Sequence, residues 1–197
     1  MESGEHEREK RAIATAALQF IHPAQSVCMD SGTTIQQLIT MLPPTMPLSI
    51  ITPSLMAALT LSNNTNIQVL IPGGVLHHSN RSILLSDPDW LSQYQADVAF
   101  LSCRSFQVPG GAFEHSQSLT FTKKALAAIA QKRILLLDFS KWNVSSLCNS
   151  LKMSDLNMII TDNKAPMDLV EKAARFGIEI LIVNPDDNTI EKHFNPA

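Results

Sequence analysis

The residues best suited to bind a ligand are Asp30-Ser31-Gly32-Thr33-Thr34, a small polar run between two apolar segments. The segment before this run predicts a strand, and the apolar residues after it recur at the spacing of a helix. A glycine turn between a strand and a helix directs backbone N–H groups and hydroxyls to one point, where the helix N-terminus adds about half a positive charge. The run therefore predicts a phosphate or carboxylate site. The alternative is that Ser31, Thr33 and Thr34 only cap the helix.

Polar residues also follow the other predicted strands. These runs are Thr52-Pro53-Ser54, Gly73-Gly74, Ser102-Cys103-Arg104, Asp138-Phe139-Ser140-Lys141 and Thr161-Asp162. Because the carboxyl ends of parallel strands share one edge of a sheet, and ligands bind there, we expect these runs to converge. Each run taken alone has an ordinary alternative, since turns also use Asp, Ser, Gly and Thr.

The elements that must position these residues predict an α/β fold. Short apolar runs alternate with longer segments of helical period, which indicates a mostly parallel, twisted sheet with helices on both faces. The predicted strands are 27–29, 48–52, 67–71, 98–101, 134–137, 158–161 and 178–183. The predicted helices are 7–21, 54–61, 120–131 and 167–176, besides the helix that begins after Gly32.

Composition indicates one globular domain over 1–197, since 45% of the residues are hydrophobic and 17% are charged. We expect a leading helix within 1–22 and a small lobe or a mobile loop around 103–119. The longest apolar runs are far shorter than the roughly twenty residues of a membrane span, and the acidic N-terminus is unlike a signal peptide. The sequence therefore predicts a cytoplasmic protein without membrane contact. The three cysteines are widely spaced, and we expect all three in the core.

Two classes of partner are disfavoured by the residues present. The net charge of −3 and the absence of a helix-turn-helix pattern argue against direct DNA binding by this chain. His77 and His78 are adjacent and have no cysteine or carboxylate at ligand spacing, so we expect no metal and no cofactor. Glu114 and His115 could form an acid–base pair on a loop that closes over a ligand.

The order and spacing of several segments resemble the effector-sensing domain of DeoR-type bacterial transcriptional regulators. The resemblance covers most of the chain. The segments that carry it are Glu9-Lys10-Arg11-Ala12-Ile13-Ala14, Asp30-Ser31-Gly32-Thr33-Thr34, Ile51-Thr52-Pro53-Ser54, Pro72-Gly73-Gly74, Ala96-Asp97-Val98-Ala99-Phe100-Leu101, Lys123-Lys124-Ala125, Leu137-Asp138-Phe139-Ser140-Lys141-Trp142 and Ile159-Ile160-Thr161-Asp162.

The resemblance implies a fold similar to ribose-5-phosphate isomerase and CoA-transferases. It implies a phosphorylated sugar or a similar anionic metabolite as ligand. It also implies DNA binding through a separate N-terminal winged helix-turn-helix absent from this chain, and assembly into a homo-dimer or tetramer.

For individual residues, the resemblance implies that Ser31 to Thr34 hold the phosphate, that Thr52, Ser54 and Gly74 line the pocket, and that Lys123 and Lys141 supply charge. Lys123 could instead be a solvated lysine, and Asp138 a structural cap. The candidate ligand-binding set is Asp30, Ser31, Gly32, Thr33, Thr34, Thr52, Ser54, Gly73, Gly74, Arg104, Lys123, Asp138 and Lys141.

This chain departs from the family pattern at Pro53, Arg104 and Leu119, where an amide, an acid and an acid are usual. These departures concern which ligand is bound. We expect a non-enzymatic sensor of carbohydrate metabolism. The alternatives are a sugar-phosphate isomerase or deaminase on the same fold, and a domain that keeps only its role in assembly. The sequence shows no close acidic pair near Lys123 for proton transfer, which counts against an enzyme.

Overall fold

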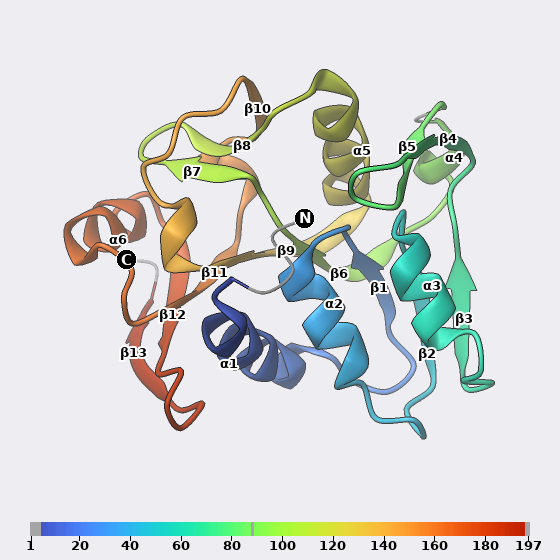
Figure 1. Cartoon of the computed structure of the whole chain (residues 1–197), viewed down its shortest axis with the longest axis horizontal. Helices are drawn as coiled ribbons and strands as arrows, with labels where there is room; N and C mark the ends of the chain where they lie inside the picture. Colours follow the sequence, from blue (N-terminus) through green and yellow to red (C-terminus); the bar gives the residue numbers. More distant parts are fainter. Residues whose placement is uncertain (1–4, 88, 196–197) are drawn as a thin grey trace.

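An eight-stranded sheet organises the chain (Figure 1), and its strands follow the spatial order β13-β12-β11-β9-β6-β1-β2-β3. The computed structural model describes residues 5–87 and 89–195, so residues 1–4, 88 and 196–197 of the predicted domain lie outside the described part. In spatial order the strands are β13 (Ile190–Phe194), β12 (Glu179–Val183), β11 (Met158–Asp162), β9 (Ala130–Leu137), β6 (Ala96–Leu101), β1 (Ser26–Met29), β2 (Leu48–Ile51) and β3 (Ile67–Leu70). All neighbouring pairs are parallel except β12 with β13.

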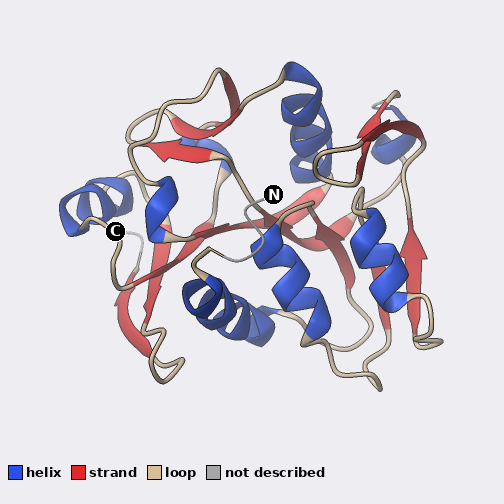
Figure 2. Cartoon of the chain, viewed as in Figure 1, coloured by secondary structure: helices blue, strands red, loops and turns tan. Residues whose placement is uncertain are grey.

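Helices cover both faces of this sheet, as the colouring by secondary structure shows (Figure 2). The helices are α1 (Glu7–Ala17), α2 (Thr33–Thr40), α3 (Leu55–Leu61), α4 (Asp89–Ser92), α5 (Gln117–Ala128) and α6 (Met167–Ala174), with 3-10 turns at Leu18–Phe20, Phe139–Lys141 and Met153–Asp155. The predicted α/β fold with a mostly parallel sheet is confirmed.

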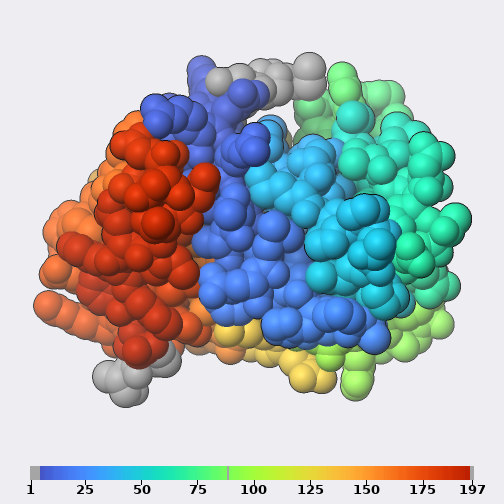
Figure 3. Space-filling model, turned by 90° about the horizontal axis from the view of Figure 1, so that it is seen from below, coloured from blue at the N-terminus to red at the C-terminus, as the bar shows by residue number. Residues whose placement is uncertain are grey.

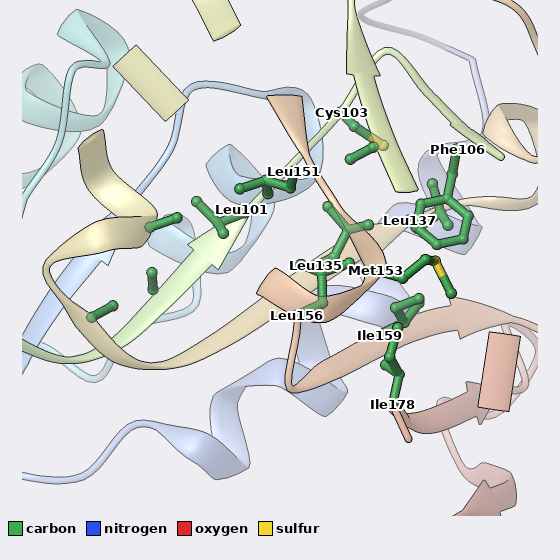
Figure 4. Packing of buried hydrophobic residues seen from close by; sticks show 14 of the residues in the cluster. Leu101, Cys103, Phe106, Leu135, Leu137, Leu151, Met153, Leu156, Ile159 and Ile178 are labelled. Atoms are coloured by element: carbon green, nitrogen blue, oxygen red, sulfur yellow. The ribbon is translucent and has the colours of Figure 1, made fainter. Parts of the chain in front are cut away.

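The main sheet has a hydrophobic core on each face, because successive side chains of a strand point to opposite faces of the sheet. Ile134 and Leu136 of β9 pack with α1, α2 and α3, whereas Leu135 and Leu137 pack on the opposite face with α5 and α6. Figure 4 shows part of the second core, where Leu135 and Leu137 lie near Phe106 and Met153. Figure 3 looks onto the first face, where the N-terminal helix in blue lies beside the C-terminal strands in red. None of the described helices is long and apolar enough to cross a membrane.

Two small antiparallel sheets were not predicted from the sequence. One consists of β10 (Cys148–Leu151), β8 (Gly111–Glu114) and β7 (Ser105–Gln107), and the other is the hairpin of β4 (Gly74–His77) and β5 (Ser82–Leu85). The segment around 103–119, for which the sequence leaves a small lobe or a mobile loop open, therefore contains two strands and the start of α5.

Some predicted boundaries differ from the structure, and one strand was missed. The predicted helix 120–131 is wrong at its end, because Ala130 already pairs with Ala96 in the sheet. The opening helix ends at Ala17 and continues as a 3-10 turn to Phe20, short of the predicted residue 21. The edge strand β13 was not predicted at all.

Candidate functional site

The main cavity lies where the order of the strands reverses. After β1 the chain continues to β2 and β3 on one side, and it then returns to β6 on the other side of β1. Such a switch point leaves a crevice beyond the carboxyl ends of the two central strands. A cavity of about 330 Å³ lies there. Its lining residues are Ser31, Gly32, Thr33, Gln36, Ser54, Met56, Ser79, Asn80, Arg81, Ser102, Cys103, Arg104, Glu114, His115, Leu119 and Lys141.

The turn between β1 and α2 provides the N-terminal end of a helix to this cavity. Gly32 is the residue before the helix, and as a glycine it has no side chain that could cap the first turn. The N–H groups of a first turn have no partners within the helix, and the helix dipole makes them attractive to an anion. Gly32 and Thr33 are both exposed to the cavity. The backbone therefore offers an anion site at the predicted position.

Gly32 is required here because the loop after β6 approaches it closely. A Cβ atom on Gly32 would lie 2.7 Å from the hydroxyl oxygen of Ser102. That hydroxyl cannot move freely, because its single hydrogen lies between two acceptors, Asp30 Oδ2 and the carbonyl oxygen of Ser31, each 2.9 Å from its oxygen. The two strand-end loops thus pack directly on each other.

Asp30 lies beneath the turn and holds it in place. Its carboxylate accepts hydrogen bonds from the backbone N–H of Ser31 at 2.8 Å, from the backbone N–H of Ser102 at 3.1 Å, and from the Lys123 ammonium. Asp30 is buried and does not line the main cavity. Its contacts hold the two loops that border the cavity.

Lys123 joins Asp30 to a second carboxylate. Its Nζ atom is 3.2 Å from Glu114 Oε1, and the side chains of all three residues are buried. Burial alone would lower the pKa of Lys123, but the two carboxylates outweigh this effect and hold the pKa above its ordinary value. The prediction that no acidic pair lies near Lys123 is therefore wrong. The sequence could not show it, because Asp30 follows β1 and Glu114 lies in β8, far apart in the chain, and only the fold brings both to Lys123.

Lys141 and Asp138 meet at the end of β9. Lys141 lines the main cavity, donates to the carbonyl oxygen of Cys103 at 3.0 Å, and lies 3.9 Å from Asp138 Oδ2. Asp138 is fully buried and caps the following 3-10 turn by accepting from the backbone N–H of Ser140. The structure thus gives Asp138 the capping contact that the sequence left as an alternative.

The predicted residues fall into two groups in space. Those that line the main cavity are Ser31, Gly32, Thr33, Ser54, Arg104 and Lys141. Those that do not line it are Asp30, Thr34, Thr52, Gly73, Gly74, Lys123 and Asp138. Thr34 and Thr52 are buried, and Thr52 Oγ1 accepts from the backbone N–H of Ser54. Gly73 and Gly74 begin the β4–β5 hairpin instead.

Several lining residues were absent from the predicted set. Ser79, Asn80 and Arg81 form the turn of the β4–β5 hairpin, and this turn reaches the cavity. The pair Ser79-Asn80 between two apolar runs is a hairpin signal that could have been found in the sequence. Glu114 and His115 also line the cavity; Glu114 contacts Lys123, and the His115 ring lies 6.3 Å from that of His77.

The cavity is richer in cations than in anions. Among the described residues, Arg81, Arg104 and Lys141 line it together with one carboxylate, Glu114, which is paired with Lys123 as Lys141 is with Asp138. Among residues 5–87 and 89–195, no three His, Cys, Asp or Glu side chains lie close enough together to hold a metal ion. The site is therefore suited to an anionic organic molecule with hydroxyl groups.

Comparisons with known proteins agree on one family. The DeoR C-terminal sensor domain matches residues 5–163. The chain is 31% identical over 157 residues to the uncharacterized HTH-type transcriptional regulator YulB of Bacillus subtilis, covering 79% of this chain and 60% of that protein. It is 27% identical over 179 residues to the HTH-type transcriptional repressor CsqR of Escherichia coli, covering 90% of this chain and 69% of that protein. The chain thus spans about two thirds or less of the length of these relatives.

Solved structures with the same fold include proteins of other functions. Ribose 5-phosphate isomerase A from Neisseria gonorrhoeae has a TM-score of 0.53 and 18% identity, covering 74% of this chain and 56% of that chain. The eIF2B beta subunit from Chaetomium thermophilum has a TM-score of 0.55 and 12% identity, covering 77% of this chain and 48% of that chain. At these identities the likeness concerns the fold alone.

Proposed function

This chain belongs to the DeoR C-terminal sensor domain family, and from that membership we propose that its main cavity binds a phosphorylated sugar or a related anionic metabolite. The ligand is the effector of a transcriptional regulator of carbohydrate metabolism. The observation that carries the proposal is the uncapped N-terminus of α2 at the switch point of the sheet, next to Lys141.

The phosphate lies against the N–H groups of Gly32 and Thr33, with the Thr33 hydroxyl and the Lys141 ammonium completing its surroundings. Backbone N–H groups and a lysine point charge are a common combination for phosphate. The rest of the ligand extends towards Glu114, His115 and the hairpin turn. Carboxylate and imidazole groups there accept hydrogen bonds from sugar hydroxyls.

The alternative, an isomerase or deaminase on the same fold, needs a general base next to the bound ligand. Lys123 is unsuited to this role. It is paired with two carboxylates, its pKa is raised, and it does not line the main cavity. A base that acts near neutral pH needs a pKa near 7. The contacts of Lys123 therefore favour a sensor over an enzyme.

Sensing further requires that the effector prefer one arrangement of the regulator over another, because a ligand that binds both equally shifts nothing. Relatives such as CsqR are named HTH-type repressors. We include in the proposal that DNA is bound by a helix-turn-helix outside this domain, that the regulator works in the cytoplasm, and that the domain assembles as a homo-dimer or tetramer. Analytical ultracentrifugation with and without effector tests the assembly.

The central experiment is isothermal titration of the domain with pentose, hexose and polyol phosphates, with the unphosphorylated compounds as references. We expect binding only of phosphorylated compounds, without their consumption over time. Thr33→Ala and Lys141→Ala should each weaken binding about tenfold, the loss of one hydrogen bond to a charged group. Thr40→Ala, at the exposed far end of α2, is the matched control and should bind normally.

Two results would contradict the proposal. Unchanged affinity in both Thr33→Ala and Lys141→Ala would remove the site assignment. Conversion of the phosphorylated sugar into an isomer by the purified domain would instead establish the enzyme alternative.

A further inference from the structure

A second cavity lies between α5, the end of β10 and the beginning of β9, on residues the proposed function does not use. Its volume is about 310 Å³, close to that of the main cavity. It shares no lining residue with the main cavity. α5 and the small sheet that form it lie above the main sheet in Figure 1.

Three cations line this second cavity, namely Lys124 on α5, Arg133 on β9 and Lys152 after β10. Asp155 is the one carboxylate among the described residues that lines it, and this carboxylate accepts a hydrogen bond from the backbone N–H of Lys152 at 2.8 Å. Within the described residues, none of the three cationic side chains forms an ion pair. The whole chain carries a net charge of −3, so this local excess of positive charge runs against the overall balance.

Arg133 differs from the two exposed lysines, because part of its side chain is buried. Its Nε atom is buried and has no hydrogen-bond partner among the described residues. No acceptor of the described chain therefore holds the Arg133 guanidinium through Nε, although its side chain lines the cavity. The neighbouring Lys132 differs, because it lies 3.7 Å from Glu179 Oε2 and over the Phe20 ring. Lys132 is thus already paired, unlike the three cations that line the second cavity.

We propose that the second cavity binds a small phosphate-bearing anion, separately from the effector in the main cavity. The planar guanidinium of Arg133 matches the oxygens of a phosphate, and the two lysines add point charges at the rim. A concave site of this volume fits a small molecule better than an extended polyanion such as DNA. The amide nitrogen of Asn149 does not take part, because its two hydrogens are donated to the carbonyl oxygens of Gly110 at 2.8 Å and Ala112 at 3.3 Å.

The test is isothermal titration with inorganic phosphate and with pyrophosphate in a Gly32→Ala, Lys141→Ala background, which disables the main cavity. This background should retain one phosphate site. Adding Arg133→Gln or Lys152→Gln should weaken that site about tenfold or more, since each removes a charged hydrogen-bond donor. Lys152 is exposed, so its substitution tests the site even if Arg133→Gln fails to fold.

Lys132→Gln is the matched control, because it removes one positive charge from β9 outside the cavity. We expect its affinity for phosphate to stay within about twofold of the background, whereas non-specific attraction would weaken equally in both lysine variants. Loss of all phosphate binding in the background, or equal effects of Lys152→Gln and Lys132→Gln, would overturn the second site. Failure of the proposed function would give a different result. The wild type and the Gly32→Ala, Lys141→Ala variant would then bind sugar phosphates with equal affinity.

Discussion

At the scale of single residues, the ion pair of Asp30 with Lys123 supports the two loops that border the main cavity. Lys123→Met leaves two buried carboxylates without their cation, so we expect a loss of about 3–5 kcal/mol in the free energy of unfolding. Urea denaturation measures this loss. The matched control is Lys172→Met. Lys172 forms an exposed ion pair with Asp168 at 3.8 Å, and its substitution should lower the free energy of unfolding by about 0.5 kcal/mol or less.

The sign of the pH dependence follows from the raised pKa of Lys123. A group whose pKa is raised in the folded state contributes its full stability below the unfolded pKa, about 10.4 for lysine, and loses it as the pH rises through the folded value. The difference between wild type and Lys123→Met should therefore persist through the neutral range and shrink only at strongly alkaline pH. A difference that disappears between pH 6 and 8 would show that the Lys123 contacts are not those described.

The three thiols should differ in reactivity. Burial raises the pKa of the Cys28 and Cys103 thiols to about 12, so neither is ionised or accessible at pH 8, whereas Cys148 is partly exposed. The sequence-based expectation that all three belong to the core holds for the first two only. We expect a thiol reagent to modify one cysteine per folded chain at pH 8, and none in Cys148→Ser. Modification of two or more cysteines without denaturant would contradict the burial of Cys28 and Cys103.

At the scale of elements, the β4–β5 hairpin has a role that the sequence did not reveal. A Cβ atom on Gly74 would lie 1.9 Å from the carbonyl oxygen of Leu84, whereas one on Gly73 would meet nothing within 4 Å. Gly74→Ala must therefore shift the hairpin, and its turn at 79–81 lines the main cavity. We expect Gly74→Ala to weaken effector binding and Gly73→Ala to leave it unchanged, as measured by titration. Equal affinities in both variants would mean that the hairpin turn does not contact the ligand.

The strands of the main sheet could be predicted from the sequence, whereas those of the small sheets could not. Runs such as Ile134–Leu137 are buried on both faces of a parallel sheet and so are apolar throughout, which made them recognisable. The strands β7 and β10 are short and contain Ser, Gln, Cys and Asn. Contacts with the rest of the fold stabilise them, and no local pattern reveals this. The loops after β1 and β6 could be predicted as parts of the site because each directly follows a recognisable apolar strand. The contact of Glu114 with Lys123 could not be predicted, because it depends on the fold.

At the scale of the whole molecule, the main cavity is lined by segments that lie far apart in the sequence. These segments are α2, α3, the β4–β5 hairpin, the loop after β6, β8, α5 and the turn after β9. A ligand bound there must be released when the domain unfolds, so binding adds to global stability. At a concentration of 100 times its dissociation constant, an effector should add about 2.7 kcal/mol. For a domain of this size we expect the melting temperature to rise by about 5–10 °C.

Gly32→Ala supplies the discriminating variant for this last prediction. The added methyl group lies against the Ser102 hydroxyl, which must give up its bonds to Asp30 and Ser31 or push the turn away from the ligand. The melting temperature of Gly32→Ala should therefore respond little to the sugar phosphate that stabilises the wild type. An equal rise in both proteins would mean that the ligand stabilises the fold from elsewhere, and the second cavity with Arg133 would be the first place to search.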